Sequence, residues 1–390
     1  MKKNTILLFP ILIMVLLITI TGCGGGGGGG SKKPKTNSTV TTGNISGIVK
    51  DASDDKLLDG VTVTVFKSSD KIGTGTTDTQ GKYFVNNIIN GNNYHVLFAI
   101  DGYQPATYYN INVNGSTSLQ TVLLIKKPIS SEKGIVSGRI IDGTKQDIDK
   151  GVEGVTINFR EGFNNITGEI INSTKTDPCG YYSKELPVGY YTAELSKDGW
   201  ITTYISVICP KGGQNGVMTP IINNDQIRII LTWGEEPQDL DAHLTGPLAP
   251  GDSSPYPDTP GRFHTYYDDL RRTYRFNDTV YAELDVDDRT SFGPETTTIH
   301  KFCSGTYRFS AHYFADYSEE TSMALANSGA QVRVFQGSAL IKTFNVPVNQ
   351  TGIIWTVFEL DGDTRVITPI NTVTKARDDI PIESLSLDKK

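Results

Sequence analysis

Acidic residues gather at two places in the second half of the chain, and their types and spacing could do chemistry. Residues 239–243 read Asp-Leu-Asp-Ala-His, and residues 285–288 read Asp-Val-Asp-Asp. Successive side chains of a strand point to opposite faces, so Asp239, Asp241 and His243 should share one face. Carboxylates held side by side repel each other unless a cation or a hydrogen-bond donor lies between them.

Several carboxylate oxygens from different strands are the ligands that a hard cation such as Ca²⁺ prefers. The predicted ligands are Asp239 and Asp241, joined across strands by Asp285, Asp287 or Glu295. The spacing is not that of an EF-hand, because the sixth position counted from Asp285 is Thr290, where glycine is needed. The alternative is that these acids form turns and protect a strand edge, satisfied by backbone N–H groups or by Arg289.

The sequence lacks the motifs of familiar catalytic centres. Four of the five histidines lie in this part of the chain: His243, His264, His300 and His312. His243 with an acid could hold zinc, but no two histidines have the spacing His-x-His or His-Glu-x-x-His. His312 alternates with an apolar strand face, so we expect it to be solvated. Neither a Gly-x-Ser-x-Gly elbow nor a suggestive Cys–His spacing occurs, and we predict that the protein is not an enzyme.

The N-terminus has the layout of a secretory signal peptide over residues 1–22, with a basic start and an apolar run from residue 6 to residue 20. Residues 20–23, Ile-Thr-Gly-Cys, resemble the lipobox of bacterial lipoproteins. The resemblance implies that Cys23 is acylated and anchors the mature chain, and that Gly24 directs it to the outer rather than the inner membrane. The alternatives are an uncleaved membrane anchor or a signal peptide followed by a free cysteine.

A flexible tether is predicted over residues 23–43, because seven consecutive glycines and a polar stretch cannot bury a core. Beyond it, two segments repeat each other: residues 46–51 recur as 137–142, and residues 77–83 recur as 176–182. Apolar residues alternate with polar ones, as in half-buried strands, and the repeated Thr-Asp-x-x-Gly predicts a turn between strands. Short strands without a helical period predict small antiparallel sandwiches.

The repeated pattern resembles the carboxypeptidase regulatory-like domain, over residues 44–126 and again over 134–222. That family has a transthyretin-like β-sandwich, grouped with carbohydrate-binding-like folds, and it holds no catalytic residues. The resemblance therefore implies a structural or binding module. The aromatic residues that could stack on a sugar are Tyr182, Trp200 and Tyr103. The alternative is that the aromatic residue after Asp-Gly closes the sandwich core.

A third sandwich is predicted over residues 225–370, followed by a polar tail over residues 371–390. Its sequence carries four stretches, Leu-Thr-Trp-Gly from residue 231, Asp-Leu-Asp-Ala-His-Leu from 239, Leu-Asp-Val-Asp-Asp from 284 and Phe-Gly-Pro-Glu from 292. These stretches resemble the YfaP-like domain of secreted bacterial proteins. That family supplies no established reaction, so the resemblance names the domain without naming its function.

Three cysteines follow Cys23. Cys179 and Cys209 lie in the same repeat, so a disulfide between them is a candidate in an oxidising envelope, and Cys303 would be left over. The first repeat has Gln80 at the position of Cys179, so the fold itself does not require the bridge.

Composition completes the prediction. The 390 residues carry 36 Lys and Arg against 43 Asp and Glu, and the absence of a basic block argues against nucleic-acid binding. We predict an all-β protein of three tandem β-sandwich domains on a lipid-anchored tether, with a non-catalytic adhesive or binding role and carbohydrate as the first ligand class. The alternative is a structural spacer or assembly protein that presents its last domain to a protein partner in the envelope.

Overall fold

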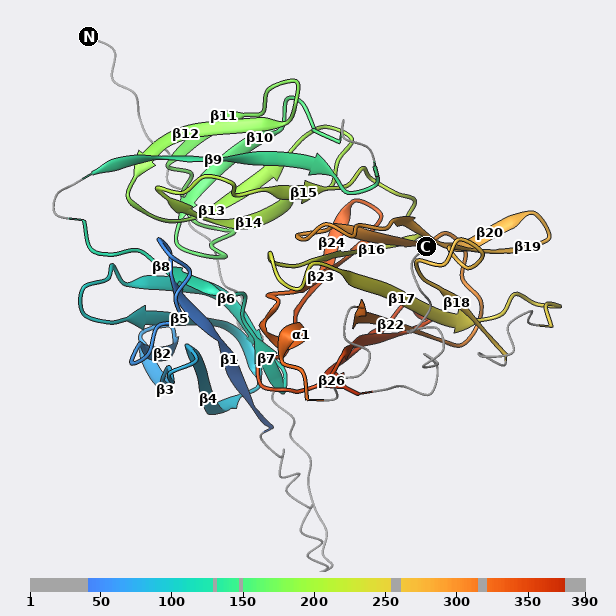
Figure 1. Cartoon of the computed structure of the whole chain (residues 1–390), viewed down its shortest axis with the longest axis horizontal. Helices are drawn as coiled ribbons and strands as arrows, with labels where there is room; N and C mark the ends of the chain where they lie inside the picture. The colour runs from blue at the N-terminus through green and yellow to red at the C-terminus, as the bar shows by residue number, and fades with distance from the viewer. Residues whose placement is uncertain (1–40, 129–131, 147–149, 254–260, 315–320, 376–390) are drawn as a thin grey trace, which may run out of the picture. The chain divides into compact units, whose positions relative to one another are not determined.

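The structure is a computed structural model that describes residues 41–375, apart from 129–131, 147–149, 254–260 and 315–320 (Figure 1). The predicted signal peptide, Cys23 and most of the tether lie outside the described residues. The described part of the chain is of the all-β class, as predicted, with one short helix among these residues, α1 (Ala324–Asn327). No helix in the described part is long and apolar enough to cross a bilayer.

The first sandwich packs two four-stranded sheets over a core that includes Ile45, Val63 and Phe98. One sheet contains β1 (Thr42–Asp51), β4 (Lys82–Ile89), β7 (Ser116–Ser118) and β8 (Val122–Leu124). The other contains β2 (Thr62–Lys67), β3 (Asp70–Thr76), β5 (Gly91–Ala99) and β6 (Ala106–Val113), in the order β3-β2-β5-β6. β1 pairs antiparallel with β4 and parallel with β7 and β8.

The second sandwich repeats this topology, except that one of its sheets has three strands where the first sandwich has four. One sheet has the order β12-β9-β15, built from β9 (Lys133–Asp142), β12 (Tyr181–Pro187) and β15 (Gly216–Met218). The other has the order β11-β10-β13-β14, built from β10 (Thr156–Glu161), β11 (Asn172–Lys175), β13 (Gly189–Ser196) and β14 (Thr203–Cys209). β9 pairs antiparallel with β12 and parallel with β15, as β1 does with its neighbours.

The repeated Thr-Asp-x-x-Gly makes the same hydrogen bonds in both copies. In the first copy, buried Thr77 accepts from the N–H of Val61 (2.9 Å) and donates to Leu58 O (2.6 Å). In the second, Thr176 accepts from the N–H of Val155 (2.8 Å) and donates to Val152 O (2.6 Å).

The other two positions of the motif also have matching roles. The Asp78 carboxylate accepts from two backbone N–H groups of its own turn, and Asp177 does the same. Gly81 and Gly180 have φ of +66° and +81°, a region that glycine enters without steric penalty. The structure thus confirms the turn that the sequence predicts.

The third sandwich contains a six-stranded and a five-stranded sheet. The first has the order β19-β20-β21-β16-β23-β24, from β16 (Ile227–Thr232), β19 (Thr273–Phe276), β20 (Thr279–Val286), β21 (Glu295–Ile299), β23 (Gln331–Gln336) and β24 (Ala339–Asn345). The second has the order β18-β17-β22-β25-β26, from β17 (Leu240–Pro247), β18 (Arg262–Thr265), β22 (Thr306–Tyr313), β25 (Ile354–Asp361) and β26 (Ile367–Thr374).

The core of the third sandwich holds the apolar strand faces that the sequence predicts, including Ile229, Leu231, Phe309 and Ala311. The last strand continues into the segment predicted as a polar tail. Val373 is buried in this core, and Asn371 accepts a hydrogen bond from Trp355 Nε1 (2.9 Å), which explains why the strand extends there.

The predicted disulfide is not formed, because Cys179 and Cys209 are both free thiols. Cys179 is exposed in the turn two residues before Tyr181, at one end of β12, whereas Cys209 pairs with Gly189, beyond the other end. The seven residues of β12 separate them by roughly 20 Å at about 3.3 Å per residue. Membership of one repeat does not bring two cysteines to the same end of a sandwich.

Replacing Thr77 with valine tests the role of the repeated turn. Thr77→Val keeps the shape of the side chain but leaves the Val61 N–H and the Leu58 carbonyl without their partner, so unfolding free energy should fall by about 1–3 kcal/mol. Chemical denaturation measures the loss, and Thr176→Val should behave alike in the second copy. Thr79→Val, at an exposed position of the same turn, is the control. Equal stability of Thr77→Val and Thr79→Val would contradict this role.

Candidate metal centre

The face of β17 that points away from the sandwich core is polar and buried. Leu240, Ala242 and Leu244 belong to the core, so strand alternation turns Asp241 and His243 to the opposite face, as predicted. The burial of that face was not predicted: the Asp241 and His243 side chains are both 0% exposed. Alternation identifies the face of a strand but not whether other residues cover it.

The neighbouring strands bring two further histidines to this face. In the sheet register, Asp241 pairs with His312 of β22, and Thr245 pairs with His264 of β18. His312 is 0% exposed, so the expectation that it is solvated is wrong. His243 Nδ1 and His264 Nε2 lie 2.8 Å apart, so one ring donates to the other. Asp241 Oδ2 lies 3.8 Å from His312 Nδ1.

Aromatic stacking fixes the rings of this cluster. Tyr266, which is buried, stacks on His243 with centroids 5.3 Å apart and on His264 with centroids 4.4 Å apart. His312 meets His243 edge to face, with centroids 5.7 Å apart. Two of the imidazoles are thus oriented against one tyrosine ring, and the third, His312, is oriented against His243.

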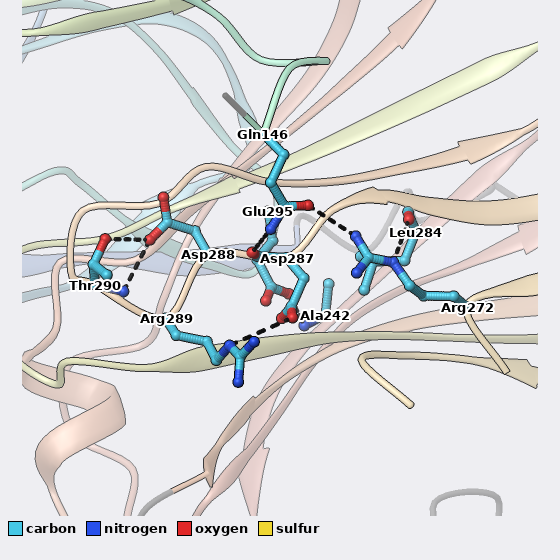
Figure 2. A network of polar contacts seen from close by, with 9 residues as sticks. All are labelled: Gln146, Ala242, Arg272, Leu284, Asp287, Asp288, Arg289, Thr290 and Glu295. Carbon is cyan, nitrogen blue, oxygen red and sulfur yellow. Dashed lines mark hydrogen bonds and ion pairs between the residues drawn. The ribbon is translucent and has the colours of Figure 1, made fainter. Parts of the chain in front are cut away.

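Carboxylates extend the cluster at Asp241. Asp239, Asp241 and Glu295 each offer one oxygen, and these oxygens lie within 4.8 Å of one another. Glu295 comes from β21 in the opposite sheet, and its Oε2 accepts the backbone N–H of Ala242. Figure 2 shows Glu295 and Asp287 close to Ala242, with Arg289 on the far side of Asp287.

Burial raises the pKa of Glu295 well above its ordinary value, and the nearby charges of Asp241 and Asp287 raise it further. The hydrogen bond from Ala242 acts in the opposite direction. A proton on Glu295 or a cation between the carboxylates would each relieve the repulsion within this group. The arrangement can thus hold positive charge.

A tight backbone approach places Glu295 in the centre. Gly293 has φ of +73°, and a Cβ there would lie 2.8 Å from the Trp233 ring. Phe292 N–H donates to Gly234 O (3.0 Å), and Trp233 N–H donates to Phe292 O (3.3 Å). Two stretches singled out in the sequence, Leu-Thr-Trp-Gly and Phe-Gly-Pro-Glu, therefore contact each other and direct Glu295 toward β17.

The structure brings Asp239, Asp241 and Glu295 together and places Asp287 beside them, but it puts Asp285 elsewhere. A register shift between Leu284 and Val286 interrupts the pairing of β20 with β21 at Asp285. The Asp285 carboxylate instead accepts from Thr298 Oγ1, and burial raises its pKa to about 6. A bulge of this kind cannot be read from alternating residues.

Asp287 and Asp288 fit the alternative interpretation, in which acids are satisfied by Arg289 or by backbone N–H groups of a turn. Arg289 Nε lies 3.8 Å from Asp287 Oδ2, and Asp288 accepts from the N–H and hydroxyl of Thr290 in a local turn (Figure 2). His264 and His312 were not predicted as members of the centre. They come from separate strands, β18 and β22, so no local spacing in the sequence marks them.

The aromatic residues predicted to face a sugar are mostly engaged inside the protein. Tyr182 is 4% exposed and donates its hydroxyl to Gln214 O (2.8 Å), which leaves no ring face for stacking. Tyr103 is half-buried and donates to Asp51 Oδ2 (2.7 Å), and Trp200 packs against the core of the second sandwich. Tyr181, next to Tyr182, is 54% exposed.

These features define a tandem β-sandwich protein with a buried polar centre in its third sandwich. Residues 44–124 match the family model of the carboxypeptidase regulatory-like domain, so this part of the chain is such a domain. The match covers one domain and not the whole chain.

Curated relatives resemble part of the chain. Serine-aspartate repeat-containing protein F of Staphylococcus epidermidis is 32% identical over 156 residues, which are 36% of this chain and 9% of that protein. Serine-aspartate repeat-containing protein D of Staphylococcus aureus strain Newman is 31% identical over 147 residues, 33% of this chain and 11% of that protein. The chain thus spans about a tenth of the length of these relatives.

Among solved structures, the Bacillus anthracis TIE protein is 13% identical over 80% of this chain and 49% of that chain, with a TM-score of 0.19. The shaft pilin SpaA of Lactobacillus rhamnosus GG is 14% identical over 46% of this chain and 98% of that chain, with a TM-score of 0.18. These TM-scores are too low for a comparison of folds.

The acid sensitivity of the first sandwich should depend on Asp51. Burial alone would raise the pKa of this carboxyl, but hydrogen bonds from Ser53, Tyr103 and Lys126 outweigh it and lower the pKa below its ordinary value. A lowered pKa in the folded state gives stability that is present above pH ~4 and is lost as pH falls through the folded-state pKa.

Asp51→Asn should therefore lower the unfolding free energy at neutral pH, by about 1–3 kcal/mol. The difference from the unmodified chain should shrink as pH falls below ~4. Urea denaturation across pH measures both. Asp59→Asn, at an exposed aspartate of the same sandwich, is the control. A difference that stays constant down to pH ~2 would contradict this prediction.

Proposed function

We propose that the chain is a non-catalytic protein of the bacterial cell envelope, in which the first two sandwiches are a spacer and the third is the binding module. The observation that carries the proposal is the duplication. The strand order of one four-stranded sheet and the hydrogen bonds of the repeated threonine occur in both copies. Repeating a module whose turn residues serve the fold supports a structural role rather than a second reaction site.

The comparisons support a structural or adhesive role. A carboxypeptidase regulatory-like domain occupies residues 44–124, and the curated relatives are named as repeat-containing proteins of which this chain spans about a tenth. A module that occurs within much longer repeat-containing chains is suited to spacing. We extend the same assignment to residues 134–222 from their matching topology, and we keep the YfaP-like assignment for residues 225–370.

Between the two ligand classes, the geometry favours a protein partner over a carbohydrate. Of the predicted sugar-stacking residues, Tyr182 is buried and Tyr103 is hydrogen-bonded to Asp51. Trp200 and the exposed Tyr181 still offer ring surface, so carbohydrate binding is the second candidate and those two rings would carry it. The third sandwich has large apolar side chains exposed at Leu270 (88%), Phe292 (57%) and Val366 (58%), which a protein partner could contact.

The acid cluster supports the cation proposal made from the sequence. Asp239, Asp241 and Glu295 form an oxygen-only set. We propose that this set, with Asp287 beside it, binds Ca²⁺ and stabilises the third sandwich. Asp285 is no longer part of the proposed ligand set.

Membrane attachment through Cys23 is the localisation part of the proposal, with the outer membrane as its destination. Labelling cells with a palmitate analogue should label the full chain, and Cys23→Ala should abolish the label and move the protein out of the detergent phase, because acyl chains supply the membrane affinity. Cys179→Ala, which removes an exposed thiol, is the control. Label retained in Cys23→Ala would contradict lipid attachment at this residue.

The spacer interpretation is tested with the full chain in two arms. A photo-cross-linker at Leu270 should form an adduct with an envelope protein, while one at Ile135, an exposed residue of the second sandwich, should not. On a glycan array, the chain should give no signal that depends on Trp200 or Tyr181. A sugar signal lost in Trp200→Ala or Tyr181→Ala would overturn the spacer interpretation and favour carbohydrate binding.

A further inference from the structure

The nitrogen-bearing end of the centre differs chemically from its carboxylate end. Asp241, His243 and His312 each offer one ligand atom, these atoms lie within 4.8 Å of one another, and all three side chains are 0% exposed. Ca²⁺ takes oxygen ligands, whereas a set of two imidazoles and one carboxylate suits zinc and its neighbours among the transition metals. The two ends share Asp241.

His312 supplies the second observation. Neither of its ring nitrogens has a hydrogen-bond partner among the described residues, although the ring is fully buried. The nearest carboxylate oxygen, Asp241 Oδ2, lies 3.8 Å from Nδ1, which is too long for a hydrogen bond. Burying an imidazole without a partner is unfavourable unless another ligand satisfies it.

We propose that Asp241, His243 and His312 bind one divalent transition metal of the zinc class. This site does not depend on the spacer role; it shares Asp241 with the proposed calcium site but takes its nitrogen ligands from His243 and His312 alone. The ligands come from adjacent strands, and Asp241 and His312 are register partners across β17 and β22. Strands hold ligand positions more rigidly than loops do.

A second layer of contacts supports the geometry. Histidine ligands of metals usually donate their other ring N–H to a partner, which fixes the tautomer. A proton on His243 Nδ1 would be donated to His264 Nε2, 2.8 Å away, and would leave the Nε2 lone pair for the metal. Tyr266 stacks on both rings and holds their planes. His264 is therefore a positioning residue rather than a ligand.

A second cluster has no histidine with unpartnered ring nitrogens and serves as a comparison. Glu283, Asp285 and His300 also lie within ligand distance of one another. There His300 Nε2 contacts Glu283 Oε1 (3.0 Å) and Nδ1 contacts Gln226 Nε2 (3.2 Å), so both ring nitrogens are used. That cluster is a satisfied polar network, and we infer no metal there.

Cobalt titration of the purified, chelator-treated full chain tests the proposal. One equivalent of Co²⁺ should produce visible d–d absorption, and Zn²⁺ should displace it while Ca²⁺ should not. His312→Asn and Asp241→Asn should remove this absorption, and His264→Gln should weaken Co²⁺ binding roughly 10- to 100-fold. His95→Gln and His300→Gln, which remove histidines elsewhere, should leave the titration unchanged.

X-ray absorption of the zinc-loaded unmodified chain covers the case in which buried variants fail to fold. Two imidazoles in the zinc shell are expected. Zinc without imidazole ligands, or cobalt absorption that survives in folded His312→Asn, overturns the proposal. If Ca²⁺ raises the melting temperature and Glu295→Gln removes this increase, the carboxylate site is supported. Glu295 belongs only to the carboxylate site and His312 only to the histidine site, so these two variants test the sites separately.

Discussion

The burial of ionisable side chains on one face of a sheet is the constraint on which the third sandwich depends. Carboxylates and imidazoles taken out of water are stable only when a partner, a proton or a cation compensates for the lost hydration. Here a backbone N–H compensates Glu295 and ring stacking supports His243 and His264, whereas the carboxylate oxygen near His312 lies 3.8 Å away, beyond hydrogen-bond distance. The core strands, the Gly293 turn and the sheet register all act to bring these groups together.

The sequence was sufficient for the features that depend on neighbouring residues. Alternation predicted the all-β fold and the core face of β17 and β22, and Thr-Asp-x-x-Gly predicted a turn whose hydrogen bonds recur in both copies. The sequence was insufficient for features that depend on packing between distant segments. Whether Asp241 and His312 are covered, where the bulge at Asp285 falls and which end of a sandwich holds Cys179 all depend on packing that no local spacing records.

The two repeated modules and the third sandwich use polar residues in opposite ways. In the repeats, the aspartate satisfies the backbone of its own turn and the threonine satisfies backbone groups of an earlier segment, so those side chains leave little to offer a ligand. In the third sandwich, side chains from four strands meet each other instead. This contrast is why we locate binding chemistry in the third sandwich and assign a spacing role to the other two.

The hydrogen bond between Glu295 and the N–H of Ala242 joins the two sheets of the third sandwich, because β21 and β17 belong to opposite layers. Relative sliding of the layers has to break this bond and separate Glu295 from Asp241. A pulling force along the strands would therefore load the hydrogen bond between Glu295 and Ala242 in the centre of the sandwich. A ligand bound in this centre would change the shear force at which the two sheets separate.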